Sequence, residues 1–116
     1  MTLTRFHSNP RLSGAVIYGD LVFLSGQVPG HSTNVEGQTR EVLAKIDALL
    51  AETGSDKDHL LSATIYLKNI TEDFAAMNEV WSAWLSPGQA PSRTTVQAEL
   101  ARPQLLVEIT VIAARS

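Results

Sequence analysis

The sequence predicts an α+β fold in which two helices pack on one face of a mixed β-sheet. Two observations carry this prediction: an apolar hairpin near the N-terminus, and two segments with helical spacing of apolar residues, each followed by a strand-like segment. A strand, a helix and a strand in succession usually form a right-handed crossover, so two such units place both helices on the same side of the sheet. The length of 116 residues fits a single domain, residues 1–116.

Short strands open the chain. Ala15–Tyr18 and Leu21–Leu24 are apolar runs, and the Gly19-Asp20 dipeptide between them suits the positive φ angles of a two-residue hairpin turn. We also expect an edge strand around residues 2–6. The N-terminal part of the sheet is therefore predicted to consist of short antiparallel strands.

Helical spacing marks two later segments. Residues 36–53 repeat apolar side chains at three- and four-residue steps, and Gly54 follows as a helix-ending residue. The second helix is predicted through residues 74–85. The acids at residues 72–73 stand where they complement the positive end of its dipole, and the Pro-Gly pair at residues 87–88 closes it.

Three further strands complete the sheet. Residues 61–68 and 93–100 alternate along the chain, the period of two that places one face of a strand on a core. Residues 105–113 form a last strand that is apolar on both faces, with Leu106 and Ile112 pointing opposite to the other apolar side chains. Helices on one side cannot cover both faces. The same face of a neighbouring subunit is the simplest cover, so we infer a homo-oligomer.

Composition excludes several classes of protein. Nine Lys and Arg against twelve Asp and Glu give a net charge of −3 with no basic cluster, so nucleic acid is not an expected partner. The absence of cysteine excludes disulfides, a thiol nucleophile and Cys-ligated metal centres. No stretch approaches the ~20 apolar residues that cross a bilayer, and no signal-peptide pattern is present, so we expect a cytoplasmic protein without a membrane partner.

Common site motifs are also missing. The three histidines stand far apart without ligands at helix-compatible spacing, and the seven glycines form no phosphate-binding loop, so neither a metal nor a nucleotide cofactor is predicted. Ser25 lacks the preceding glycine of a hydrolase elbow and is interpreted as structural or as a backbone contact. Trp81 and Trp84 share helical spacing with Phe74 and Met77, which favours a place in the core over a stacking platform.

Arg93 and Glu108 remain as candidates for chemistry. Glu108 stands in the middle of an apolar strand, where desolvation of a carboxylate is costly unless the group is paired or functional. Arg93 follows Pro91 at the start of a strand, and arginine suits bidentate capture of a small carboxylate. Two structural interpretations are equally open: an ion pair between Arg93 and Glu108 across adjacent strands, or a Glu108 that faces solvent at a sheet edge.

The chain resembles the RidA family, also called YjgF, and is most similar to its YoaB-like branch. The resemblance covers nearly the whole sequence, and its most specific part is a Pro-x-Arg element followed at the family's distance by Val-Glu-Ile. The matching segments are Val22–Pro29, Gln38-Thr39 with Val42-Leu43, Ala63–Leu67, Asp73–Asn78, Ala90–Val96 and Val107–Ile109.

This resemblance implies a chorismate-mutase-like α+β fold of the RidA type, with two helices on one face of a mixed sheet, assembled as a homotrimer. It places the ligand clefts between adjacent subunits. The implied activity is hydrolytic deamination of reactive 2-imino or enamine acids, such as 2-aminoacrylate, to 2-keto acids and ammonia. Small 2-imino or 2-keto acids are the implied partners, and no metal or organic cofactor is needed.

Individual roles follow from the matched positions. Arg93 matches the arginine that binds the substrate carboxylate, and Glu108 matches the glutamate that positions the attacking water. Gly26, next to Ser25, matches the loop whose backbone contacts the ligand. Thr95 stands where the family often has cysteine, and its main-chain carbonyl is available for a contact with the water.

One segment departs from the family pattern. Residues 11–14 replace the family's usual Gly-Pro-Tyr element, so an aromatic wall of the cleft is missing or supplied differently. Asn78 matches a recurrent helix residue that we interpret as structural.

The alternative function is a non-catalytic trimeric module that binds small carboxylates. Translation inhibition or ribonuclease activity has been attached to relatives, and the acidic charge balance argues against it.

Overall fold

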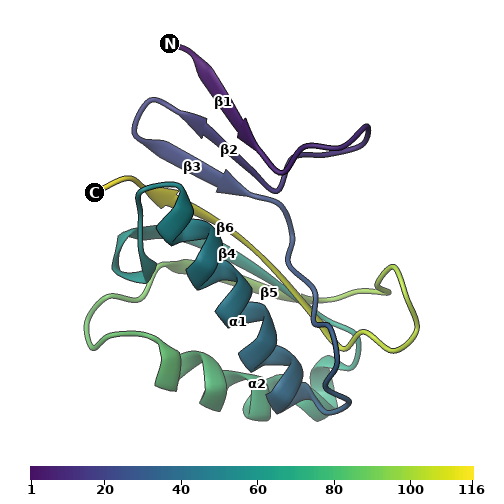
Figure 1. The fold of residues 1–116 in the computed structure, drawn as a ribbon. Coiled ribbons are helices and arrows are strands. Elements are labelled where there is room, and N and C mark those ends of the chain that lie inside the picture. Colours follow the sequence, from purple (N-terminus) through teal and green to yellow (C-terminus); the bar gives the residue numbers. More distant parts are fainter.

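The computed structural model describes residues 1–116 and confirms an α+β fold with one six-stranded sheet. Figure 1 shows both helices on the same side of this sheet. The strands lie in the order β1-β2-β3-β6-β4-β5. The elements are β1 (Leu3–Phe6), β2 (Ala15–Tyr18), β3 (Leu21–Leu24), α1 (Val35–Glu52), a short 3₁₀ turn (Lys57–His59), β4 (Leu60–Leu67), α2 (Ile70–Trp84), β5 (Ser92–Gln97) and β6 (Val107–Ala114).

The strand pairing explains why the helices share a face. β3 and β4 are both antiparallel to β6, which lies between them, so the β3-α1-β4 unit is a crossover between parallel strands. β4 and β5 pair directly in parallel, joined through α2. β1, β2 and β3 form the expected antiparallel meander, and Gly19 has the positive φ of 61° that its hairpin turn requires. The predicted edge strand at the N-terminus is confirmed.

Two strand boundaries differ from the sequence prediction. The strand predicted over residues 93–100 ends at Gln97, because the last bond to β4 is the one that the Ala98 N–H donates to Leu67 O at 3.0 Å. The last strand begins at Val107 and not at Leu105. The Leu105 N–H donates to Arg102 O in a turn, so the apolar run that predicts this strand begins before the strand itself.

The core lies between the helices and the sheet. In β6 every second residue, from Val107 to Ala113, is buried against the helices, while Glu108, Thr110 and Ile112 point to the other face. Trp81 is only 4% exposed and packs in this core with Met77, as predicted, whereas Phe74 is 40% exposed and lies outside the core, so its predicted core position is wrong. Trp84 is partly exposed and its indole N–H donates to Asp47 at 2.9 Å.

The second face of the sheet, which we call the open face, is not covered within the chain. It exposes large apolar side chains, among them Tyr18 at 44% and Phe23 at 39%. An apolar surface of this kind is typical of a contact between subunits. No helix of the structure is long and apolar enough to span a membrane.

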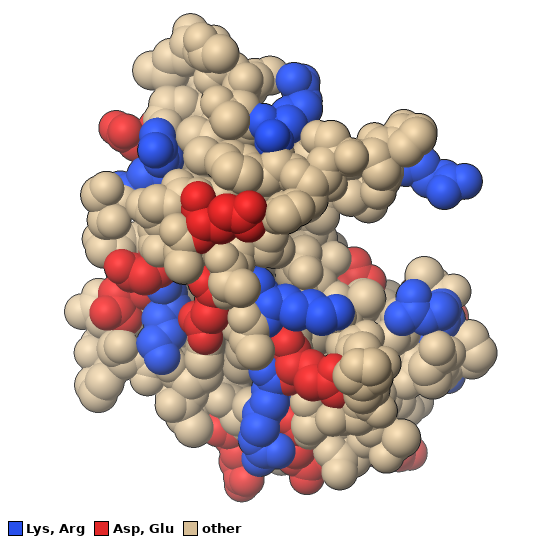
Figure 2. All heavy atoms as spheres, viewed as in Figure 1, with Lys and Arg blue, Asp and Glu red and all other residues tan.

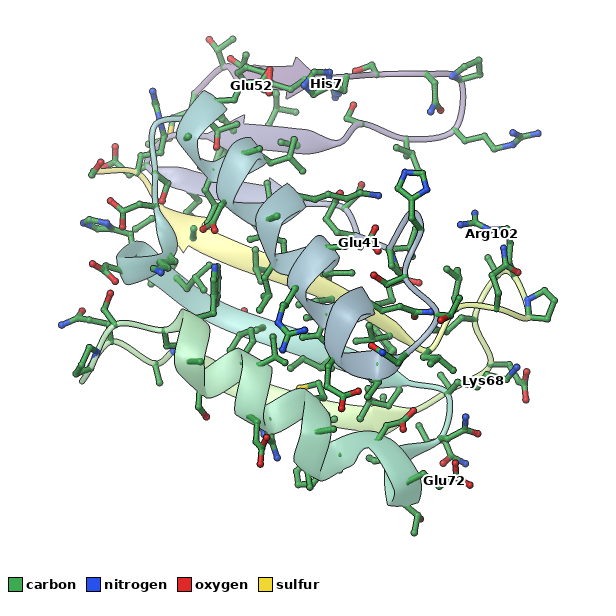
Figure 3. The ribbon with its side chains drawn as sticks, turned by 60° about the horizontal axis from the view of Figure 1, so that its bottom comes forward. His7, Glu41, Glu52, Lys68, Glu72 and Arg102 are labelled. Atoms are coloured by element: carbon green, nitrogen blue, oxygen red, sulfur yellow. The ribbon has the colours of Figure 1, made fainter.

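Two carboxylates fix loops around α1. Glu41 accepts hydrogen bonds from the backbone N–H groups of Gly30 and His31, at 2.8 and 3.0 Å, and from that of Ser32. Hydrogen bonds to the carboxylate, those from Ser32 above all, lower the pKa of Glu41 to about 2. At the other end of the helix, Glu52 and His7 lie side by side, with 2.8 Å between Oε2 and Nε2 (Figure 3).

Candidate functional site

Arg93 lies on the helix side of the sheet and is held there by α2. Its Nη1 donates a hydrogen bond of 2.7 Å to Asn78 Oδ1. The rings of Phe74 and Trp81 flank the guanidinium, each with its centroid 5.8 Å from Cζ, a distance at which a cation is attracted to an aromatic face. These contacts fix the direction of the guanidinium before any ligand arrives.

The charge of Arg93 has no carboxylate partner in the chain. The two ion pairs of the protein are His7–Glu52 and His59–Asp56, and neither involves Arg93. Arg93 lines a hollow of about 510 Å³ together with Ile70, Thr71, Phe74 and Thr95. An oriented and unpaired guanidinium at such a hollow can bind a small carboxylate in a bidentate manner.

Thr95 lies two residues after Arg93 on the same face of β5. Its Oγ1 is buried without a hydrogen-bond partner, which is uncommon for a buried hydroxyl. The two residues therefore line one hollow.

Glu108 occupies a second hollow on the open face. This hollow has a volume of about 450 Å³ and is lined by Gly26, Tyr66, Glu108 and Thr110 with the segment that follows β5, residues 98–101. Gly26 allows the close approach of Glu108, because a Cβ at that position would lie 2.1 Å from Glu108 Oε2. The Gly26 side of the hollow is fixed by paired backbone bonds between Gln27 and Ile109, of 2.8 and 3.1 Å.

The fold separates Arg93 from Glu108. Both structural alternatives for the pair are wrong: β4 lies between β5 and β6, so the two residues are not on adjacent strands, and β6 is an interior strand and not an edge. Their side chains also point to opposite faces, since Arg93 contacts α2 while Glu108 lies on the open face. One chain alone does not bring the predicted pair together.

Ser25 has a structural role in this chain. Its Oγ donates a hydrogen bond of 2.6 Å to Ser13 O, and its N–H donates to Gly14 O at 3.0 Å. These bonds tie the end of β3 to the loop before β2. The structural interpretation of Ser25 fits this geometry, and its neighbour Gly26 is the residue that borders the Glu108 hollow.

The sequence does not show that α2 orients Arg93. Asn78 is interpreted as structural, and in the structure its amide oxygen accepts the hydrogen bond that positions this arginine. Phe74, Asn78 and Trp81 stand at i, i+4 and i+7, a spacing that places them on one helix face. The same spacing was available in the sequence, but the sequence does not tell which strand residue this face meets.

The helix side of the molecule carries charged side chains of both signs (Figure 2). Figure 2 shows, on the helix side, basic and acidic side chains interspersed without a continuous basic stripe. No three His, Cys, Asp or Glu side chains come together in an arrangement that could hold a metal ion.

Known proteins are similar to this chain in sequence and in fold. The family model described as Endoribonuclease L-PSP matches residues 2–115. The RutC family protein YoaB of Escherichia coli is 42% identical over 114 residues, which are 98% of this chain and 99% of YoaB. A YjgF family member from Neisseria meningitidis has a crystal structure with a TM-score of 0.98 and 47% identity, covering 100% of this chain and 97% of that one. A putative translation initiation inhibitor from Salmonella typhimurium gives a TM-score of 0.88 at 42% identity, with 97% of both chains covered.

Proposed function

Because the chain belongs to the RidA/YjgF family and to its YoaB-like branch, we propose that it hydrolyses reactive 2-imino or enamine acids, such as 2-aminoacrylate, to 2-keto acids and ammonia. The observation that supports this most is the state of Arg93: a half-buried guanidinium, oriented by Asn78 and without a carboxylate partner, at the wall of a hollow. The carboxylate of a small substrate can therefore form the ion pair with Arg93 that no carboxylate of the chain forms.

The substrate carboxylate binds Arg93 in this proposal. A planar guanidinium forms two parallel hydrogen bonds to a carboxylate, which fixes both the position and the orientation of the attached imine carbon. The backbone of Gly26 contacts the ligand, and the main-chain carbonyl of Thr95 contacts the attacking water. No metal or organic cofactor takes part in the step.

The attacking water is held by Glu108. Since Arg93 and Glu108 lie on opposite faces of one chain, the site requires a second chain. In the proposed homotrimer the edge of the sheet at β5, which carries Arg93, meets the open face of the next protomer beside Glu108 of the partner subunit. The exposed apolar side chains of the open face support such an assembly. The clefts then lie between adjacent subunits.

The reaction balances without an external oxidant or reductant. An enamine first becomes the imine by moving one proton from nitrogen to its terminal carbon. The water oxygen then bonds to the imine carbon as one water proton passes to the Glu108 carboxylate, the C=N π electrons move to nitrogen, and Glu108 returns the proton to that nitrogen to give the carbinolamine. As the C–N bond breaks, the hydroxyl proton moves to the nitrogen, ammonia leaves, and the C=O bond of the 2-keto acid forms. Imines hydrolyse spontaneously, so the site need only orient water and stabilise the developing charge.

A coupled assay tests the proposal. A threonine dehydratase generates the enamine, and keto-acid release is followed with and without the protein. We expect the wild type to accelerate release and Arg93→Ala to abolish the acceleration, while Arg93→Lys, which keeps the charge but not the fork, retains a small part. No acceleration by the wild type, or full acceleration by Arg93→Ala, would overturn the proposal.

A second candidate is a non-catalytic trimeric module that binds small carboxylates. It is favoured by one observation: the hollow at Arg93 is built by a single chain, whereas joining Arg93 to Glu108 requires a second one. Affinity for 2-oxobutanoate that depends on Arg93, without turnover of any imine, would support this module and contradict the deaminase.

Binding of RNA is not part of the proposal, although two of the matched names refer to a ribonuclease and to a translation initiation inhibitor. The net charge of −3 and the interspersed surface charges offer no electrostatic footprint for a phosphate backbone. We expect no measurable binding of RNA at low salt. Tight, salt-dependent binding would contradict this expectation.

A further inference from the structure

Tyr66 faces Glu108 across two paired strands. In the β4–β6 register the two residues are direct partners, and both line the hollow of about 450 Å³ on the open face. Side chains of such a pair have their Cβ atoms roughly 5 Å apart, close enough to act on one small molecule between them. The Tyr66 phenol and the Glu108 carboxylate can therefore contact the same small molecule in this hollow.

Tyr66 is the free side-chain donor of this hollow. The Thr110 hydroxyl is already engaged, since it donates to Leu24 O at 2.9 Å. Glu99 and Glu108 offer acceptors when ionised, and the remaining lining residues have no polar side chain. A water molecule in the hollow thus finds carboxylate acceptors for its protons and one hydroxyl donor for its oxygen.

We propose that the Tyr66 hydroxyl holds the attacking water together with Glu108. No direct hydrogen bond joins the two side chains, and polar groups that face each other beyond direct reach are commonly bridged by water. This inference rests on the proposed function and adds a residue to it: Glu108 accepts a hydrogen bond from the water, and Tyr66 donates one to a lone pair of its oxygen. The second lone pair stays free for the imine carbon.

Glu108 and Tyr66 have different roles in the proton transfer. When the bond between the water oxygen and the imine carbon forms, the water proton passes to Glu108, and Tyr66 keeps its own proton. Tyr66 contributes orientation, and since it touches the water and not the substrate carboxylate, its loss affects turnover more than binding.

The chain contains two tyrosines, which gives a matched control. Tyr66→Phe removes the hydroxyl from the hollow, while Tyr18→Phe removes one from the open face at β2, outside the hollow. We expect Tyr66→Phe to lower kcat about 5- to 30-fold with KM changed less than about twofold, as for the loss of one hydrogen bond. Tyr18→Phe should leave both constants unchanged.

A double-mutant cycle separates this role from a structural one. In a Glu108→Gln background the water has lost its base, so Tyr66→Phe should cost less than about twofold in addition. An equal cost in both backgrounds, or wild-type kcat in Tyr66→Phe, would overturn the inference.

A crystal structure of the assembled protein provides a test that does not depend on turnover. We expect a water within hydrogen-bond distance of both Tyr66 Oη and Glu108 in the wild type, and its loss or displacement in Tyr66→Phe. A bridging water in a protein without imine turnover would show the water site but refute the proposed function and, with it, the attacking role of that water. Turnover without such a water would refute the inference and leave the function standing.

Discussion

Gly26→Ala should impair catalysis while leaving the fold largely intact. The added Cβ would lie 2.1 Å from Glu108 Oε2 and 3.0 Å from its Cδ. Ordinary van der Waals contact begins near 3.4 Å, so the carboxylate has to retreat by about 1.3 Å. The clash involves the far end of a flexible side chain, and Gly26 does not have a positive φ, so the backbone accepts alanine without strain.

The kinetic cost follows from this displacement. A catalytic group misplaced by about 1 Å can cost roughly 100-fold in rate, so we expect kcat of Gly26→Ala to fall by about 10- to 100-fold. Keto-acid release in the coupled dehydratase assay measures the loss, and thermal unfolding measures stability. The melting temperature should change by no more than a few degrees, since no packed side chain is removed.

Gly88→Ala is the matched control. Gly88 has a φ of 77°, and an added Cβ meets nothing within 4 Å. A left-handed conformation costs alanine about 1 kcal/mol, so this variant should lose stability and keep full activity. The reasoning is refuted if Gly26→Ala keeps wild-type kcat, or if it is destabilised as much as Gly88→Ala.

Three other substitutions test separate parts of the structure. Asn78→Ala removes the 2.7 Å bond to Arg93, and the affinity for 2-oxobutanoate measured by calorimetry should fall about 10-fold; unchanged affinity would show that the aromatic rings alone orient the guanidinium. Glu41→Gln should be less stable than the wild type at neutral pH. Hydrogen bonds in the folded state hold the pKa of Glu41 down, so the ionised carboxylate stabilises the fold and its protonation removes this stabilisation. The deficit of Glu41→Gln in the free energy of unfolding should therefore shrink as the pH falls from 4.5 towards about 2. A pH-independent difference in denaturant titrations would contradict this expectation. Phe23→Glu places a charge on the open face and should convert a trimer to monomers in sedimentation; an unchanged mass would exclude this face as the interface.

Much of the fold could be predicted because periodicity reports burial directly. The hairpin at Gly19-Asp20, both helices and the two-sided character of β6 all follow from local spacing, and the structure confirms them. The end of β5 and the start of β6 differ from the prediction, because the alternation in β5 and the apolar run before β6 both extend beyond the hydrogen-bonded strand. Local pattern thus predicts the type of an element better than its limits.

The sequence by itself determined the candidate residues: Arg93 and Glu108 were identified from their motif, and Thr95 and Gly26 from the same resemblance. Only the tertiary structure decided how these residues are arranged. The position of β4 between β5 and β6, and the opposite directions of the two side chains, place Arg93 and Glu108 on different faces of the sheet. Strand order depends on contacts between segments that are distant in the chain, so no local pattern encodes it. The same long-range packing brings Asn78 to Arg93 and Tyr66 opposite Glu108.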